Sequence, residues 1–167
     1  MFFVYRFLAA VSQAVIECGG QPNQFVGDGA LALFGMNTSP RIACRQALKA
    51  AAMIATNVEE LNQFLSHDLN EPIRFGIGIH GGSALVGEIG YGATRIYTAL
   101  GDAPSLAAQL EALCGDLDVE VVISDVVGKQ SGFELSSLGR RIVEARGFNE
   151  PIAVRIARNA EAIPVGV

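Results

Sequence analysis

The chain has 167 residues, of which 50% are hydrophobic, so it is long enough and apolar enough to form one compact domain with a sizeable core. Its formal net charge of −5, from 12 Lys and Arg against 17 Asp and Glu, argues against a broad nucleic-acid or anionic-membrane surface. The three cysteines, Cys18, Cys44 and Cys114, form no CxxC pair, which disfavours a zinc site and favours a reducing compartment, the cytoplasm.

The first expected element is a helix over residues 2–18. Phe3, Phe7 and Val11 recur at helical spacing, and a pair of glycines follows where the helix would end. Arg6 interrupts the apolar run, so an amphipathic helix is favoured over a secretory signal. No apolar run approaches the ~20 residues that a membrane-spanning helix requires.

Two short strands joined by a tight turn come next. We expect the strands at Gln24–Val26 and Ala30–Phe34, with Gly27-Asp28-Gly29 as the turn. Asp-Gly is a common hairpin turn because Gly accepts positive φ and Asp hydrogen-bonds locally, so Asp28 has an ordinary structural interpretation. Alternatively, the two apolar strands hold the Asp28 carboxylate at the end of a sheet, where Mg²⁺ is commonly bound by one or two carboxylates and substrate phosphates. The turn alone leaves both interpretations open.

The rest of the chain predicts helices and strands in mixed order. Ser39 and Pro40 are typical of a helix start, and the long helix is expected to run to about Leu65. The further expected elements, in chain order, are strands over 73–82, 83–90 and 96–100, a helix over 103–114, a buried strand over 119–124, and a closing hairpin of Phe133–Leu138 and Ile152–Ile156. Because strands and helices do not alternate strictly, we expect an α+β sandwich with helices over a mostly antiparallel sheet.

Two stretches of the sequence together carry a family resemblance. They are GGQPNQFVGDGALALFG at 19–35 and GIGIHGGSALVGEIGYGATRIYTALGDAPSLAAQLEAL at 76–113. In order and spacing they resemble the class III adenylate/guanylate cyclase catalytic domain, and the resemblance extends from Phe2 to about Arg158. It implies a ferredoxin-like βαββαβ-type sandwich over residues 1–167, lacking the first strand of the family and the first metal-binding aspartate on that strand.

The resemblance also implies a reaction. The family converts ATP or GTP to the 3′,5′-cyclic nucleotide and pyrophosphate at the interface of a head-to-tail dimer. One Mg²⁺ or Mn²⁺ ion activates the ribose 3′-hydroxyl and a second neutralises the triphosphate. Asp28 matches the second metal-binding aspartate of the pattern, and no match to the first is present. We therefore expect a divalent metal cofactor, ATP or GTP as substrate, a homodimer, and further domains in the parent protein.

The other site positions depart from the family pattern. The catalytic Asn and Arg positions fall on Ser105 and Gln109, four residues apart on one helix face. Gln109 carries no charge, and loss of such an Arg costs about 10³-fold or more in rate. Base selection falls on Gln24 and Thr98, a pair that favours adenine but can meet either purine, because Gln both donates and accepts. The nearest match to the family's late phosphate-binding lysine is Arg146, for which a surface role is equally open.

Two further polar residues have ordinary structural interpretations. Asp102 precedes a predicted helix, and we expect it to act as the N-cap. His80 lies between glycines in a predicted strand, and we expect it to be packed and hydrogen-bonded rather than to act as a general base.

The sequence leaves an enzyme and a binding module open as functions. One is an active cyclase domain; the other is a catalytically silent cyclase-homology module that dimerises or senses nucleotide, because three catalytic groups of the family are missing together. A third interpretation, RNA binding on a ferredoxin-like sheet, is opposed by the acidic charge and the low aromatic content of 7%. Without the first strand, apolar sheet surface would be exposed, so we also expect dimerisation or strand replacement.

Overall fold

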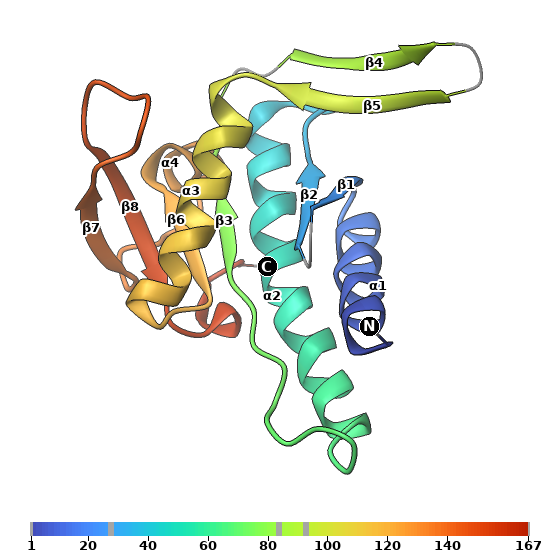
Figure 1. Ribbon diagram of the computed structural model, residues 1–167. Helices are drawn as coiled ribbons and strands as arrows, with labels where there is room; N and C mark the ends of the chain where they lie inside the picture. The colour runs from blue at the N-terminus through green and yellow to red at the C-terminus, as the bar shows by residue number, and fades with distance from the viewer. Residues whose placement is uncertain (1, 27–28, 83–84, 92–93, 167) are drawn as a thin grey trace.

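The structure is a computed structural model that describes residues 2–26, 29–82, 85–91 and 94–166 (Figure 1). Its elements are α1 (Phe2–Glu17), β1 (Gln21–Val26), β2 (Gly29–Leu33), α2 (Pro40–Phe64), β3 (Ile77–Ile79), β4 (Leu85–Tyr91), β5 (Thr94–Leu100), α3 (Asp102–Leu117), β6 (Val121–Ser124), α4 (Asp125–Ser131), β7 (Gly139–Val143), β8 (Ile152–Ala157) and the 3-10 helix η1 (Ala160–Ala162). Among the helices described, none combines the length and apolar character needed to cross a membrane.

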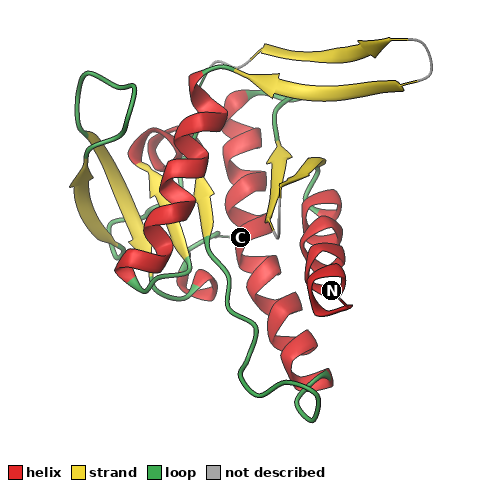
Figure 2. Cartoon of the chain, in the orientation of Figure 1, coloured by secondary structure: helices red, strands yellow, loops and turns green. Residues whose placement is uncertain are grey.

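The strands form three separate sheets (Figure 2). Four strands pair in the order β3-β6-β8-β7, while β1-β2 and β4-β5 are two-stranded hairpins. Only the β3-β6 pair is parallel among the pairings described, and the others are antiparallel. The expected α+β arrangement with mostly antiparallel strands is therefore confirmed.

The long helix α2 forms as its sequence predicts. The Ser39 hydroxyl accepts a hydrogen bond of 3.3 Å from the Ile42 N–H, and Pro40 occupies the first turn, where a missing N–H costs nothing. Four of its eight buried residues are alanines, which let α2 pack closely against neighbours on two sides. One side meets α1, and the other meets α4 and η1.

The main core lies on both faces of β6. Side chains alternate along a strand, so Val121 and Ile123 point into a cluster with α2 and α4, while Val122 points into a cluster with α3. All four residues of β6 are at most 1% exposed. Burial of a Val or Ile side chain stabilises by about 1.5–3 kcal/mol, so β6 anchors the helices to both faces of the sheet.

Helix α3 lies unusually close to β3. Gly78 packs directly on the backbone of α3, and a Cβ at this position would collide with the Ala107 carbonyl and the Glu111 N–H. Only glycine permits this approach, because any side chain would separate the strand from the helix.

A large cavity separates the β1-β2 hairpin from the four-stranded sheet. Its volume is about 1780 Å³, and side chains of α1, β2, α2, β3 and α3 line it. Both β2 and β3 pair with another strand on one edge only, within the part of the chain that the structure describes. The apolar surface that the sequence leads us to expect is found here, and dimerisation through it stays a prediction.

The predicted strand Phe133–Leu138 is wrong. Gly132, with φ of 74°, ends the unpredicted helix α4, and the Phe133 N–H then bonds to the Ser131 hydroxyl at 3.1 Å. Leu135 and Leu138 are both buried, a spacing of three that suits a turn and not an alternating strand. The strand of the closing hairpin is β7, which begins directly after this segment.

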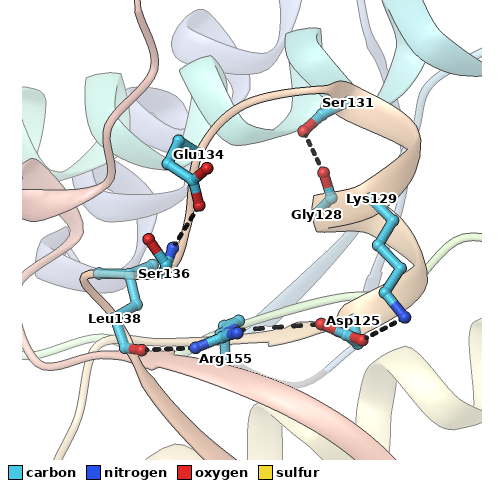
Figure 3. Close-up of polar contacts among 8 residues, drawn as sticks. All are labelled: Asp125, Gly128, Lys129, Ser131, Glu134, Ser136, Leu138 and Arg155. Atoms are coloured by element: carbon cyan, nitrogen blue, oxygen red, sulfur yellow. Dashed lines mark hydrogen bonds and ion pairs between the residues drawn. The ribbon is translucent and has the colours of Figure 1, made fainter.

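Polar contacts hold this segment in place (Figure 3). Arg155 on β8 donates to the Leu138 carbonyl at 3.0 Å and lies 4.0 Å from the Asp125 carboxylate. Lys129 lies 3.1 Å from the same carboxylate, one helical turn along α4. Asp125 is thus neutralised by two cations and serves the structure.

The predicted strand over 73–82 is shorter in the structure, where β3 covers only Ile77–Ile79. The side-chain amide of Asn62 on α2 pairs with both backbone groups of Ile73. It accepts from the Ile73 N–H at 2.7 Å and donates to the Ile73 carbonyl at 3.1 Å. Both backbone groups of Ile73 are therefore satisfied by a helix side chain and need no neighbouring strand.

Candidate functional site

Asp28, the predicted metal ligand, lies outside the described residues. The residues on either side of the turn, Val26 and Gly29, are antiparallel partners, so the predicted hairpin is confirmed. The role of Asp28 in metal binding stays a prediction.

Gln24 and Ser105 line the same large cavity. Gln24 comes from β1, directly after an irregularity at which the register shifts between Pro22 and Gln24. Such a bulge turns the strand locally and re-aims its side chains. Ser105 comes from the first turn of α3. Two of the residues that the sequence predicts for the site, 81 positions apart, are thus brought to one cavity.

Thr98 lies on β5, where it pairs with Gly87 of β4. Its side chain is outside the described part of the structure. Strands β5 and β1 are in contact, so the two strands that carry the predicted base-reading residues, Gln24 and Thr98, are neighbours.

Gln109 and Arg146 are joined directly. The Gln109 side-chain amide accepts from the Arg146 N–H at 2.8 Å and donates to the Arg146 carbonyl at 3.0 Å. Both residues are also part of the lining of a second, small cavity of about 120 Å³ between α3 and β7. Gln109 does not line the large cavity that contains Ser105 and Gln24. The sequence suggests both positions but gives no indication that they pair.

His80 is packed and hydrogen-bonded, as expected. Its Nδ1 lies 2.9 Å from the Ser124 hydroxyl, which joins the chain after β3 to the end of β6. Burial lowers the pKa of His80 from its ordinary value of 6.5, because the protonated ring loses solvation. His80 therefore has a structural role, through its hydrogen bond to Ser124.

The Asp102 cap is wrong by one position. Gly101, with φ of 126°, occupies the N-cap, and Asp102 is the first residue of α3. A carboxylate in the first turn still interacts favourably with the positive end of the helix.

The cysteines are all free thiols. Burial raises the pKa of Cys114 to about 11, and it also raises the pKa values of Cys18 and Cys44. Thiols of this kind stay protonated at neutral pH and act as small apolar groups.

A metal site is not assembled by the described residues alone. Over residues 2–26, 29–82, 85–91 and 94–166, no three His, Cys, Asp or Glu side chains come together in a way that could hold a metal ion. Asp125 is committed to Lys129 and Arg155. The expected metal therefore depends on Asp28.

Known proteins share both sequence and fold with this chain. A family model, described as the adenylate and guanylate cyclase catalytic domain, matches residues 23–155. An adenylate cyclase of Anabaena cylindrica is 27% identical over 160 residues, which are 91% of this chain and 31% of the relative. The terminal-differentiation specific adenylate cyclase of Dictyostelium discoideum is 26% identical over 155 residues, which are 91% of this chain and 7% of the relative. The chain thus spans less than a third of these curated relatives.

Solved structures show the same fold. The guanylyl cyclase Cya2 has a TM-score of 0.79 at 23% identity, with 92% of this chain and 77% of that chain covered. The adenylyl cyclase CyaB from P. aeruginosa has a TM-score of 0.71 at 20% identity, with 92% and 80% covered. Both are catalytic domains of ferredoxin-like fold, and the expected fold class is confirmed.

Proposed function

Because the chain belongs to the family of adenylate and guanylate cyclase catalytic domains, we propose that it is a nucleotide cyclase domain that acts on ATP or GTP. The observation that carries this proposal is the family match over residues 23–155, which includes the Asp28 turn and α3. In the reaction, the ribose 3′-oxygen bonds to the α-phosphorus and releases its proton to solvent. The bond from the α-phosphorus to the bridging oxygen breaks, and pyrophosphate leaves.

The protein residues have distinct roles in this proposal. Gln24 and Thr98 hydrogen-bond the purine edge, since amide and hydroxyl groups both donate and accept. Ser105 hydrogen-bonds the reacting sugar and phosphate, and Arg146 neutralises the polyphosphate. Asp28 would hold Mg²⁺ or Mn²⁺, which when bound supplies charge neutralisation at the phosphates.

The proposal includes a head-to-tail homodimer in the cytoplasm. Support for a dimer comes from the placement of the polar groups: Gln24 lies on the hairpin side of the large cavity, while Gln109 and Arg146 lie outside that cavity. A second copy of the chain would bring its own Gln109 and Arg146 to the cavity that Gln24 lines in the first copy. Support for the cytoplasm comes from the three free cysteines.

A catalytically silent, nucleotide-binding module is the second candidate. The pairing of Gln109 with the Arg146 backbone favours it, because this amide is engaged and brings no positive charge to a transition state. Such a module binds ATP or GTP without forming product.

Calorimetry and product analysis separate the candidates. The purified chain is titrated with ATP and GTP in the presence of Mn²⁺, and the mixtures are analysed for cyclic nucleotide and pyrophosphate. Binding with product supports the cyclase, and binding without product supports the silent module. Absence of binding for both nucleotides contradicts both. Asp28→Asn is the matched control, which should weaken binding with Mn²⁺ and leave metal-free binding unchanged.

A further inference from the structure

The loop between β7 and β8 is fixed at Arg146. Ala145 and Phe148 pack against the core cluster of α3, and the Phe148 N–H bonds to the Ala145 carbonyl at 3.2 Å. Gly147, with φ of 85°, makes this tight turn possible. From α3, the Gln109 side-chain amide hydrogen-bonds to both the N–H and the carbonyl of Arg146. The backbone at this position is thus held from two directions.

The side chain of Arg146 is not used by these contacts. It is exposed, and among the described residues no carboxylate lies within 4.0 Å of its guanidinium. A long cationic side chain on a fixed backbone is well prepared for an anion, because less conformational freedom is lost on binding.

The chemistry of the pairing requires an amide at residue 109. The backbone of Arg146 presents one donor and one acceptor, and the side-chain amides of Asn and Gln offer the complementary acceptor and donor on two atoms of one planar group. An Arg at residue 109 has no acceptor and a Glu has no donor when ionised, so each would lose one of the two bonds. Asn has the same amide but is one methylene shorter than Gln, so its amide would lie farther from the backbone of Arg146.

We propose that Gln109 is a positioning residue that holds Arg146 for the phosphates of a nucleoside triphosphate. This rests on the proposed nucleotide-binding function, and it gives Gln109 a role other than the transition-state contact implied by its place in the family pattern. Gln109 acts through the backbone of Arg146 and does not itself touch the nucleotide.

The same chemistry occurs a second time in the chain and provides a matched control. Asn62 on α2 pairs with both backbone groups of Ile73, at 2.7 and 3.1 Å. Here the residue whose backbone is bound is Ile73, which has no charged side chain that could bind a phosphate. Loss of this clamp should lower stability without selective loss of phosphate binding.

The test is a double-mutant cycle of Gln109→Met and Arg146→Ala, read by calorimetry with ATP and with adenosine. Met keeps the length of Gln and removes both hydrogen bonds. We expect each single variant to bind ATP about tenfold more weakly, with adenosine binding unchanged, because two hydrogen bonds that order the loop are lost in one case and the cation in the other. The double variant should bind ATP no more weakly than Arg146→Ala alone.

Three further measurements make the outcome decisive. Amide hydrogen exchange at residue 146 should accelerate in Gln109→Met and stay slow in Arg146→Ala. Asn62→Leu should leave the ATP to adenosine ratio unchanged. Gln109→Arg should weaken ATP binding, whereas a transition-state role for this position predicts a gain in product formation.

Two results would overturn the inference, and they differ from failure of the proposed function. If the parent chain binds ATP but Gln109→Met does not alter that binding although exchange at residue 146 accelerates, Gln109 does not position Arg146. Additive losses in the double variant contradict it as well. If the parent chain binds no nucleotide, the proposed function itself fails and the inference fails with it.

Discussion

The two ends of the large cavity belong to very different parts of the molecule. In the closed half, which is the four-stranded sheet with α3 and α4, β6 pairs on both edges and is at most 1% exposed. In the open half, which is α1 with the β1-β2 hairpin, every described side chain of β2 is partly or fully exposed. Apolar sequence is plentiful in both halves. Pairing on both edges of a strand, more than hydrophobic content, decides which half is well packed.

The difference also separates stability from function. The predicted base-reading residue Gln24 lies in the open half, and the Asp28 turn is part of the same hairpin. Isolated two-stranded hairpins are only marginally stable in water. We therefore expect most of the folding free energy in the closed half and most of the ligand response in the open half.

The largest test of this contrast is truncation of one leucine in each half. Leu48 on α2 is fully buried in the cluster with β6, and we expect Leu48→Ala to lower the free energy of unfolding by about 2–5 kcal/mol. Leu31 on β2 lines the cavity, and Leu31→Ala should cost less than about 1.5 kcal/mol, because its surroundings are already partly open. Urea denaturation measures both. Equal losses would show that the halves are packed alike.

Enlargement of a small residue tests the contrast in the opposite direction. Ala157 on β8 is 1% exposed in the closed half, and Ala157→Leu should destabilise by about 1–3 kcal/mol through overpacking. Ala47 on α2 lines the large cavity, so Ala47→Leu should be neutral or stabilising. Thermal unfolding of the two variants measures the difference. A large loss for Ala47→Leu would mean that the cavity closes in solution.

A substitution on the β1-β2 hairpin tests whether Gln24 in the open half selects the purine base. Gln24→Glu replaces an amide by an acceptor-only carboxylate, which suits the two N–H donors of guanine and opposes the N1 acceptor of adenine. We expect the ratio of GTP to ATP affinity to rise about tenfold, as measured by calorimetry. Gln21→Glu is the matched control, since it makes the same change on the same strand but at a residue that does not line the cavity. An equal shift in both variants would indicate a general charge effect.

The smallest expected effect is on pH dependence at the border of the halves. Burial lowers the pKa of His80 below 6.5, so the unfolded chain binds a proton more readily than the folded one. The contribution of neutral His80 to the free energy of unfolding is complete above pH 6.5 and is lost as pH falls through the pKa that His80 has in the folded chain. His80→Gln should flatten the stability profile of the protein between pH 7.5 and 5.5, measured by urea denaturation. A profile as steep as that of the parent chain would exclude His80 as the cause.

Local patterns predict the regular elements of this fold well. Residues Ser39 and Pro40 mark the start of α2, and the apolar run at 119–124 marks β6. The two wrong strand predictions depend on tertiary packing, whereas the Asp102 cap is a local error of one position. No strand pairing forms at Ile73, where Asn62 on another element satisfies both backbone groups, and Phe133–Leu138 is a turn because two leucines three apart enter the core.

The candidate site shows the same limit. The family motif leads to Gln24, Thr98, Ser105 and Gln109 by position alone. The bond between Gln109 and Arg146, 37 residues apart, depends on how α3 lies over the β7-β8 loop. No local pattern contains that information, because it arises from the packing of α3 on the sheet.

The contact at Gly78 has a mechanical consequence. At Gly78 the backbone of β3 lies directly on the backbone of α3, so no side chain of residue 78 lies between them that could repack and absorb a shift. We therefore expect a displacement of β3 at the cavity wall to move α3 as well, and with it the Gln109 amide that binds the backbone of Arg146. The hydrogen atom of Gly78, in place of a methyl group, thus couples the position of β3 to that of α3.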